Sequence, residues 1–326
     1  MSKFLKNFSQ ESSPARKRLS TIDYVTYDKM LTRKASEISA IRSPVLSKLS
    51  PDLRNKTERI LGELRGFGKA IVAFSGGIDS TVVAHLARFA LGEDAIAVTA
   101  DSPSLPASEL AGAKRLAKLI GIKHLIIRTE ELEDPNYISN PTNRCYFCKK
   151  ELSEKLRRLG SDLGVSVIVE GTNADDLKEH RPGVAALVER GVRRPLADVG
   201  MTKAEVRELA KLCGLPNFDK PSMPCLSSRV QYGQRITSER LARIERSENL
   251  IRSLTGVKEL RVRDHGDLAR IEVGKNEREL FFDEELLDRI GNSLRQCGFI
   301  YVAFDLLGYR SGSMNELLIS NTKSKQ

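Results

Sequence analysis

One short stretch, Ser75-Gly-Gly-Ile-Asp-Ser80, constrains the fold of this chain more than any other. It follows an apolar run at 70–74, typical of a buried strand, and precedes an apolar-periodic run at 81–91, typical of a helix. The first backbone N–H groups of such a helix have no partners within it, and the helix dipole adds positive potential there. The stretch therefore predicts a strand–loop–helix unit that binds an anion.

The residue types in this stretch suit a bound phosphate. Gly76 and Gly77 allow the backbone to approach an anion closely, and Ser75 and Ser80 supply hydroxyl donors. Asp79 would repel a bare phosphate, but it fits if Mg²⁺ bridges its carboxylate and the phosphates. A Gly/Ser turn in an ordinary strand–helix connection is the alternative, and the position before a helix favours the phosphate site.

Strands and helices continue to alternate beyond this unit. Short, β-branched strands separated by helices of about a dozen residues predict a parallel sheet covered on both faces. We expect helices at 51–64, 81–91, 108–121 and 149–160, and strands at 70–74, 95–100, 123–128 and 165–170. The fold class is thus predicted to be α/β, with a Rossmann-like parallel sheet in the first domain.

The pattern changes in the C-terminal third. A capping box at Thr202 and Glu205 opens a helix that ends near 213. Later helices are expected at 237–254 and 283–297, and strands at 257–263, 268–273 and 299–306. This order predicts a smaller α+β domain. The expected division is a basic flexible extension at 1–50, a nucleotide domain at 51–225, a substrate and oligomerisation domain at 226–310, and a flexible tail at 311–326.

The positive charge is concentrated near the N-terminus. The formal net charge is +10, and residues 1–50 hold ten Lys/Arg against four acidic residues. An organelle transit peptide is a minor alternative for this segment. The rest of the chain has a small basic excess that a phosphate-rich small-molecule site can balance, so we expect no nucleic-acid partner. Apolar runs fall short of the roughly 20 residues of a membrane span, so we expect no membrane contact.

Five cysteines, an odd number, argue against a disulfide framework and for a reducing, cytoplasmic compartment. Cys145 and Cys148 are expected in a loop before a basic helix, where cations favour thiolates, and Cys225 in a Pro-bounded loop. Cys213 and Cys297 are interpreted as core residues. The C-x-x-C pair alone is compatible with a redox dithiol, half a zinc site, a cluster ligand or chance. Three thiolates suit a [4Fe–4S] cluster with one open iron.

The hexapeptide at 75–80 resembles the SGGxDS loop of the PP-loop ATP-pyrophosphatases. The resemblance implies that Ser75, Gly76, Gly77, Asp79 and Ser80 bind ATP phosphates. It places Ala100, at the end of the second strand, beside the nucleoside. Gly171 begins the second nucleotide loop, and Asp176 in that loop is a candidate Mg²⁺ ligand with Asp79. A surface turn rich in Asn and Asp is the alternative at Asp176.

Further segments match one branch of that superfamily. They are Arg194-Pro-Leu, Met201-Thr-Lys-Ala-Glu-Val-Arg, Gly214-Leu-Pro, Asp219-Lys-Pro, Cys225-Leu-Ser-Ser-Arg-Val-Gln-Tyr-Gly, Arg261-Val-Arg-Asp-His-Gly and Ala269-Arg-Ile-Glu-Val. They resemble the LarE-type ATP-dependent sulfur transferases over about residues 55–306. The family adenylates a carboxylate of a pyridinium dicarboxylate mononucleotide, an intermediate of the nickel-pincer cofactor, and replaces AMP with sulfur.

The resemblance assigns roles to the remaining candidates. Cys225 holds the position of the sulfur-donating cysteine, which is sacrificed to dehydroalanine in some members. With Cys145 and Cys148 it resembles the three-cysteine members, which hold a [4Fe–4S] cluster. Arg261 and Arg263 are candidates for binding the substrate phosphate and carboxylate. Arg229 and Glu272 are weaker candidates for the same pocket. The alternative for the two strand arginines is a solvated strand face.

Two other functions remain open at this point. A tRNA thiolase of the same superfamily also uses three cysteines and a cluster, and the basic arm favours it. A non-catalytic nucleotide-binding or iron–sulfur scaffold would bind ATP without turnover. We expect an enzyme that uses ATP, Mg²⁺ and a [4Fe–4S] cluster on a small nucleotide-like substrate. We further expect a homo-oligomer, and the sulfur donor is not identified.

Overall fold

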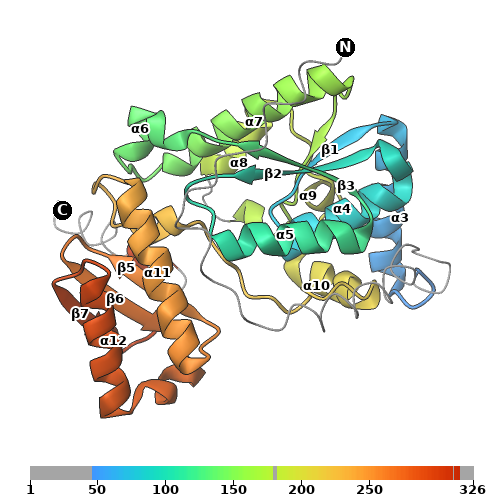
Figure 1. Ribbon diagram of the computed structural model, residues 1–326. Coiled ribbons are helices and arrows are strands. Elements are labelled where there is room, and N and C mark those ends of the chain that lie inside the picture. Colours follow the sequence, from blue (N-terminus) through green and yellow to red (C-terminus); the bar gives the residue numbers. More distant parts are fainter. Residues whose placement is uncertain (1–45, 179–181, 311, 316–326) are drawn as a thin grey trace, which may run out of the picture.

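The computed structural model describes residues 46–178, 182–310 and 312–315. Most of the predicted extension at 1–50 and most of the tail at 311–326 lie outside these residues. The first sheet holds four parallel strands in the order β3-β2-β1-β4 (Figure 1). Their bounds are β1 (Ala70–Ala73), β2 (Ala95–Asp101), β3 (Lys123–Arg128) and β4 (Ile168–Val169). The predicted parallel α/β sheet is therefore confirmed.

Helices cover both faces of this sheet. One face packs against α3 (Pro51–Phe67), α4 (Ile78–Leu91), α5 (Ala107–Ile120) and α10 (Lys203–Leu212), and the other against α7 (Arg144–Leu163) and α8 (Pro182–Glu189). Successive strand residues enter opposite cores: Val72 belongs to the first and Ile71 to the second. This alternation follows from the two-residue period of a strand. It explains why the strands read as unbroken apolar runs.

The helix that carries the C-x-x-C pair begins earlier than predicted. It starts at Arg144 rather than near 149, so Cys145 and Cys148 lie in its first two turns and not in a loop. The cause is a turn just before it. Asn140 has a positive φ of 54°, and the Arg144 N–H donates to Pro141 O at 3.0 Å, which starts the helix. The two cysteines, three residues apart, therefore share one face of α7.

The fourth predicted strand is shorter than expected, because the cap of the preceding helix includes its first residues. β4 covers Ile168–Val169 rather than 165–170. Gly164 ends α7 in the left-handed conformation, and the Val165 N–H still donates to Gly160 O at 2.7 Å. The first residues of the predicted strand thus serve as the cap of the preceding helix.

A second, three-stranded sheet lies in the C-terminal part, in the order β5-β6-β7. Its elements are β5 (Leu260–Asp264), β6 (Leu268–Val273), β7 (Tyr301–Phe304), α11 (Ser238–Thr255) and α12 (Glu284–Gln296). β5 and β6 are antiparallel, and β6 and β7 are parallel. Both helices pack on this sheet and are seen beside it in Figure 1. The expected α+β part is present; its boundary at 225/226 stays a prediction.

The two parts meet through a small apolar cluster. Tyr137, in α6 (Pro135–Ile138), packs with Leu226 and Val230 and with Leu241 of α11. Phe147 and Cys148 of α7 border the same cluster. The residues around Cys225 therefore lie at the junction. Among the described helices, none has both the length and the apolar character needed to cross a bilayer.

Candidate active site

Loop 75–80 joins the C-terminal end of β1 to α4, and hydrogen bonds within it fix its shape. Ser80 Oγ accepts from the Ser75 N–H at 3.3 Å and donates to Gly77 O at 3.0 Å. Gly77 is the N-cap of α4, and it has no side chain with which to cap the helix. The side chain at the N-cap therefore does not occupy the first-turn N–H groups, and anion binding there stays a prediction.

Two glycines let the backbone pack tightly around this loop. Gly76 has a φ of +74°, and a Cβ there would lie 3.0 Å from Ala113 Cα. A Cβ on Gly171 would lie 2.6 Å from the Ser80 backbone nitrogen, closer than real Cβ contacts. The loop after β4 therefore presses directly on the first turn of α4. Only glycine fits at 171.

The residues predicted to bind the nucleotide gather at one edge of the sheet. Ser75, Ala100 and Gly171 lie at or just beyond the C-terminal ends of β1, β2 and β4, which are neighbouring strands. Thr99 Oγ1 donates to Phe74 O at 2.6 Å and so joins the ends of β1 and β2. This edge of a parallel sheet is where ligands bind in open α/β folds.

The two predicted Mg²⁺ ligands lie in adjacent loops linked by one asparagine. Asn173 Nδ2 donates to Asp79 Oδ1 at 3.2 Å, and the Asn173 backbone N–H donates to Asp176 Oδ2 at 3.1 Å. Asp79 and Asp176 are therefore near one another at this edge of the sheet. Among the described residues, no three His, Cys, Asp or Glu side chains are placed to hold a metal ion together. The assignment of both as ligands stays a prediction.

The sequence analysis missed a cation at this edge. Lys203 Nζ forms an ion pair with Asp79 Oδ2, and the Lys203 backbone N–H donates to Asp175 Oδ2 at 2.8 Å. Lys203 is the first residue of α10, directly after the Thr202 cap. The capping box predicted where α10 begins, but it could not predict that Lys203 pairs with Asp79. A lysine here can compensate either Asp79 or the charge of a bound phosphate.

The three predicted cysteines are brought together at the junction of the two parts. Burial raises the pKa of the Cys148 thiol to about 12, and the charge of Lys149 acts against this rise. The charges of Cys225 and Cys145 raise it further, so both thiols lie close enough to interact with Cys148. The expected stabilisation of a thiolate by nearby cations is wrong for Cys148, because burial outweighs Lys149. Within the part of the chain that the structure describes, the three thiols are not arranged as a metal-binding group.

The predicted substrate residues are buried and hold the Cys225 loop. Arg229 Nη1 donates to Pro224 O and Cys225 O at 2.6 and 3.0 Å. Arg261 Nη2 donates to Ser222 O at 2.8 Å. Arg263 Nη1 donates to Ser228 O at 3.1 Å. The two strand arginines do share one face, as their alternation predicted, but the face is covered by the loop rather than solvated.

Two buried carboxylates complete this arginine network. Glu248 of α11 accepts from Arg229 Nε at 3.0 Å, and Glu272 of β6 accepts from Arg263 Nη2 at 2.7 Å. Burial alone raises the pKa of Glu248, but Arg229 and Arg252 outweigh it and lower the pKa overall. Arg229 and Arg263, which hold loop carbonyls, are thus each paired with a buried carboxylate. Whether these arginines also reach a substrate stays a prediction.

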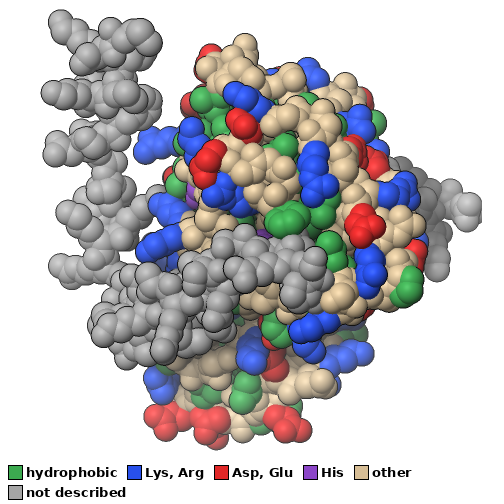
Figure 2. Space-filling model, turned by 90° about the vertical axis from the view of Figure 1, so that its right-hand side faces the viewer, with side chains coloured by type: hydrophobic (Ala, Val, Ile, Leu, Met, Phe, Trp, Pro, Cys, Tyr) green, Lys and Arg blue, Asp and Glu red, His purple; other side chains and the backbone are tan. Residues whose placement is uncertain are grey.

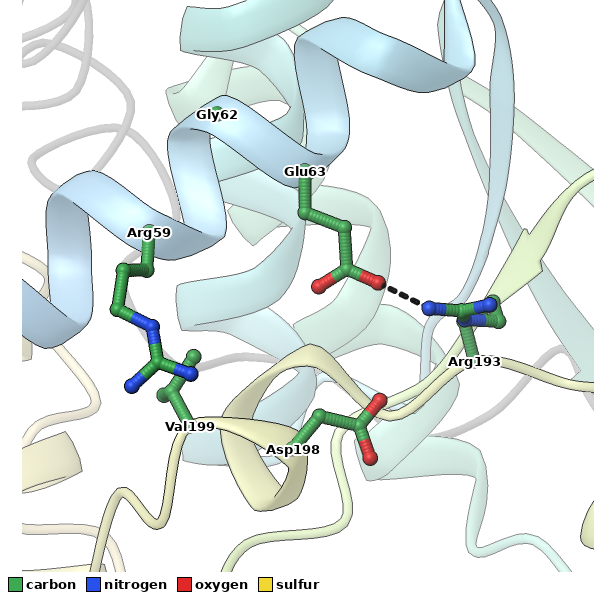
Figure 3. Close-up of a pocket in the computed structure, with 6 residues that line it drawn as sticks. All are labelled: Arg59, Gly62, Glu63, Arg193, Asp198 and Val199. Atoms are coloured by element: carbon green, nitrogen blue, oxygen red, sulfur yellow. Dashed lines mark hydrogen bonds and ion pairs between the residues drawn. The ribbon is translucent and has the colours of Figure 1, made fainter.

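A shallow cavity of about 400 Å³ lies elsewhere on the first part. It is lined by Arg59, Gly62, Glu63, Arg193, Asp198 and Val199, and Glu63 pairs with Arg193 across it (Figure 3). None of these residues was predicted for the site. In Figure 1, α3 lies at the opposite side of the first part from α6 and α11. On the face shown in Figure 2, basic and acidic side chains of the described residues are interspersed.

Comparisons with known proteins agree with this geometry. The asparagine synthase family matches residues 61–145, which include the loop at 75–80. Pyridinium-3,5-bisthiocarboxylic acid mononucleotide synthase of Lactiplantibacillus plantarum is 35% identical over 82% of this chain and 96% of its own length. The chain belongs to this synthase's family. The LarE-type resemblance is thereby confirmed, and with it an enzyme of the sulfur-transferase class; the iron–sulfur type is not tested by the match.

Two further relatives match this chain to different extents. An uncharacterized protein of Synechocystis is 45% identical over 82% of this chain and 99% of its own length. A glutamine-hydrolyzing GMP synthase of Aeropyrum pernix is 27% identical over 57% of this chain and 40% of its own length. This likeness and the asparagine synthase match at 61–145 together support the use of ATP by this chain.

Proposed function

We propose that the protein uses ATP to adenylate a carboxylate of pyridinium-3,5-dicarboxylate mononucleotide and then replaces AMP with sulfur, forming a thiocarboxylate. The match to the L. plantarum synthase over 96% of that protein's length carries the proposal. Pyrophosphate and AMP are the other products. The free first-turn N–H groups of α4, the Ser75 and Ser80 hydroxyls and Lys203 support a site for the leaving pyrophosphate.

Adenylation is needed because a carboxylate is a poor acyl electrophile at neutral pH. Attack of the acceptor carboxylate on the α-phosphorus of ATP forms the acyl adenylate and expels pyrophosphate. Mg²⁺, when bound near Asp79 and Asp176, would supply charge neutralisation for that leaving group. Lys203 would leave Asp79 for the phosphates as the pyrophosphate charge develops. Asp79 would then be free to face the cation.

Sulfur transfer requires the Cys225 sulfur to reach the acyl carbon. Its thiolate would displace AMP and form a thioester. Cleavage of the Cβ–Sγ bond, with loss of the Cα proton, would then release the thiocarboxylate and leave dehydroalanine at 225. The arginine contacts to Pro224, Cys225 and Ser228 support this role because they hold the loop in one place.

The test is a single turnover with the purified chain, ATP, Mg²⁺ and the pyridinium acceptor. We expect acceptor-dependent AMP and pyrophosphate, and loss of the mass of H₂S from the peptide that contains Cys225. An unchanged mass with bound iron and sulfide, after anaerobic purification, would instead indicate that Cys145, Cys148 and Cys225 hold the predicted [4Fe–4S] cluster. ATP binding without AMP formation would overturn the proposal, and co-purifying tRNA would favour a tRNA thiolase.

A further inference from the structure

A short chain of hydrogen bonds leads from the nucleotide edge to the loop that carries Cys225. Leu226, the residue after Cys225, donates its N–H to Ser104 O at 2.8 Å. Ser104 follows the end of β2, and its Oγ donates to Glu131 Oε1 at 2.9 Å. Two hydrogen bonds therefore connect Glu131 to the neighbour of the sulfur-bearing residue.

Glu131 fixes the conformation of the segment after β2. Ser102 Oγ also donates to Glu131 Oε1, and the Ser104 backbone N–H donates to Ser102 Oγ at 3.0 Å. Glu131 is only 1% exposed, and its Oε2 has no hydrogen-bond partner within the described residues. A buried carboxylate with one unpaired oxygen is costly. Oε1 alone accepts the hydrogen bonds from the two serine hydroxyls.

The same short segment provides a second attachment for the loop. Glu131 begins a 3₁₀ turn (Glu131–Glu133), and six residues later Tyr137 lies in α6. Tyr137 Oη lies 2.6 Å from Ser227 Oγ, and both side chains are buried. Residues 131–137 thus contact the loop directly at Ser227 and through Ser104 at Leu226. Cys148 also lies close enough to Glu131 for their charges to interact.

We propose that Glu131 is a positioning residue for sulfur transfer: by holding Ser102 and Ser104, it docks the Cys225 loop onto the nucleotide edge of the sheet. This inference rests on the proposed function. Glu131 itself acts on Cys225 through Ser104 and the Leu226 N–H, rather than on the phosphates. Its loss should slow sulfur transfer and leave adenylation intact.

The variants Glu131→Ala, Glu131→Gln and Glu133→Ala separate this role from a general effect on folding. Ala removes the acceptor for both serines. Gln keeps a carbonyl oxygen for them and places its amide at the unpartnered Oε2 position, so Gln should restore the wild-type behaviour. Glu133 lies in the same turn but is less buried, which makes it the matched control.

Hydrogen–deuterium exchange at Leu226 gives a readout that needs neither ATP nor acceptor. In Glu131→Ala we expect exchange of the Leu226 amide to be about tenfold faster, because the Ser104 carbonyl is no longer held in place. Single-turnover transfer to the acceptor should fall about tenfold, with the KM for ATP and the rate of pyrophosphate release unchanged. Glu133→Ala should match the wild type in all three.

Three outcomes would overturn the inference. The first is a Leu226 exchange rate in Glu131→Ala equal to that of the wild type. The second is a Glu131→Gln variant that behaves like Glu131→Ala. The third is a rate of pyrophosphate release in Glu131→Ala that falls as much as sulfur transfer does. If Glu131→Ala does not fold, Ser104→Ala removes the hydroxyl that donates to Glu131 while keeping the backbone carbonyl, and it should show the same increase in Leu226 exchange. If the wild type fails to adenylate the pyridinium acceptor, the proposed function fails, but the Leu226 exchange still tests the docking.

Discussion

At the scale of single residues, the ion pair between Asp79 and Lys203 is the most informative contact. Asp79 also accepts from Asn173, so its carboxylate is engaged by two partners before any ligand arrives. A carboxylate left alone at this edge would repel a triphosphate. Lys203 removes that repulsion, and it can itself contact a phosphate when Asp79 turns to a cation.

We therefore expect Lys203→Ala to weaken ATP binding. The KM for ATP should rise by about tenfold or more, since a hydrogen bond between charged groups contributes roughly 1.5–3 kcal/mol. The single-turnover rate of pyrophosphate release, measured at varied ATP concentrations, gives this change. Lys211, exposed on the same helix, supplies the control variant Lys211→Ala. Equal KM values for Lys203→Ala and Lys211→Ala would contradict a role of Lys203 in phosphate binding.

At the scale of elements, the site depends on how closely the loop after β4 approaches the first turn of α4. Gly171 has no room for a side chain, because a Cβ would lie 2.6 Å from Ser80 N and 2.9 Å from the Asp79 carbonyl carbon. Both neighbours are backbone atoms of a helix start. They cannot move aside without distorting the loop at 75–80.

Gly171→Ala should therefore destabilise the fold by about 1–3 kcal/mol, as overpacking does, and reduce ATP binding. Gly62 provides the contrast, since it lies within α3 and a Cβ added there would meet nothing within 4 Å. Gly62→Ala should raise stability by roughly 0.5–1 kcal/mol, because alanine favours the helix. Urea unfolding measures the free energy of unfolding of both variants. An unchanged value for Gly171→Ala would contradict the close approach of the loop after β4 to α4.

At the scale of the whole molecule, buried charges connect the second sheet to the Cys225 loop. Glu248 from α11 pairs with Arg229 at its Nε, and the Glu248 side chain is only 2% exposed. Arg252 also pairs with Glu248 at 3.1 Å. Because Arg229 in turn holds Cys225 O, acid that protonates Glu248 should loosen both the junction and the loop.

The pH dependence follows from the lowered pKa of Glu248. Its folded pKa lies below the ordinary 4.5, so the unfolded chain binds more protons between the two values. The stabilisation is fully present above about pH 4.5 and is lost as the pH falls through the folded pKa. Glu248→Gln should lower the free energy of unfolding by about 3 kcal/mol at pH 7, since it leaves Arg229 without its counter-charge. Denaturant titrations should show that the free energies of unfolding of the wild type and of Glu248→Gln become more alike below pH 4.5. A difference that stays constant with pH would contradict the pairing of Glu248 with Arg229.

The sequence alone determined the local units. A glycine- and serine-rich loop between an apolar strand and a helix predicts an anion site, because backbone geometry and exposed N–H groups follow from neighbouring residues. The alternating apolar runs likewise specified the parallel sheet, and the cysteine and arginine motifs led to the LarE family. These signals depend on residues close together in the chain.

Only the tertiary structure decided what meets across the fold. Lys203 and Asp79 are 124 residues apart, and Glu131 reaches the Cys225 loop through Ser104. The arginines at 261 and 263 were predicted to share a face, but the loop carbonyls that cover it come from elsewhere in the chain. Such contacts are set by the packing of whole elements, which depends on the summed burial of many side chains rather than on any local motif.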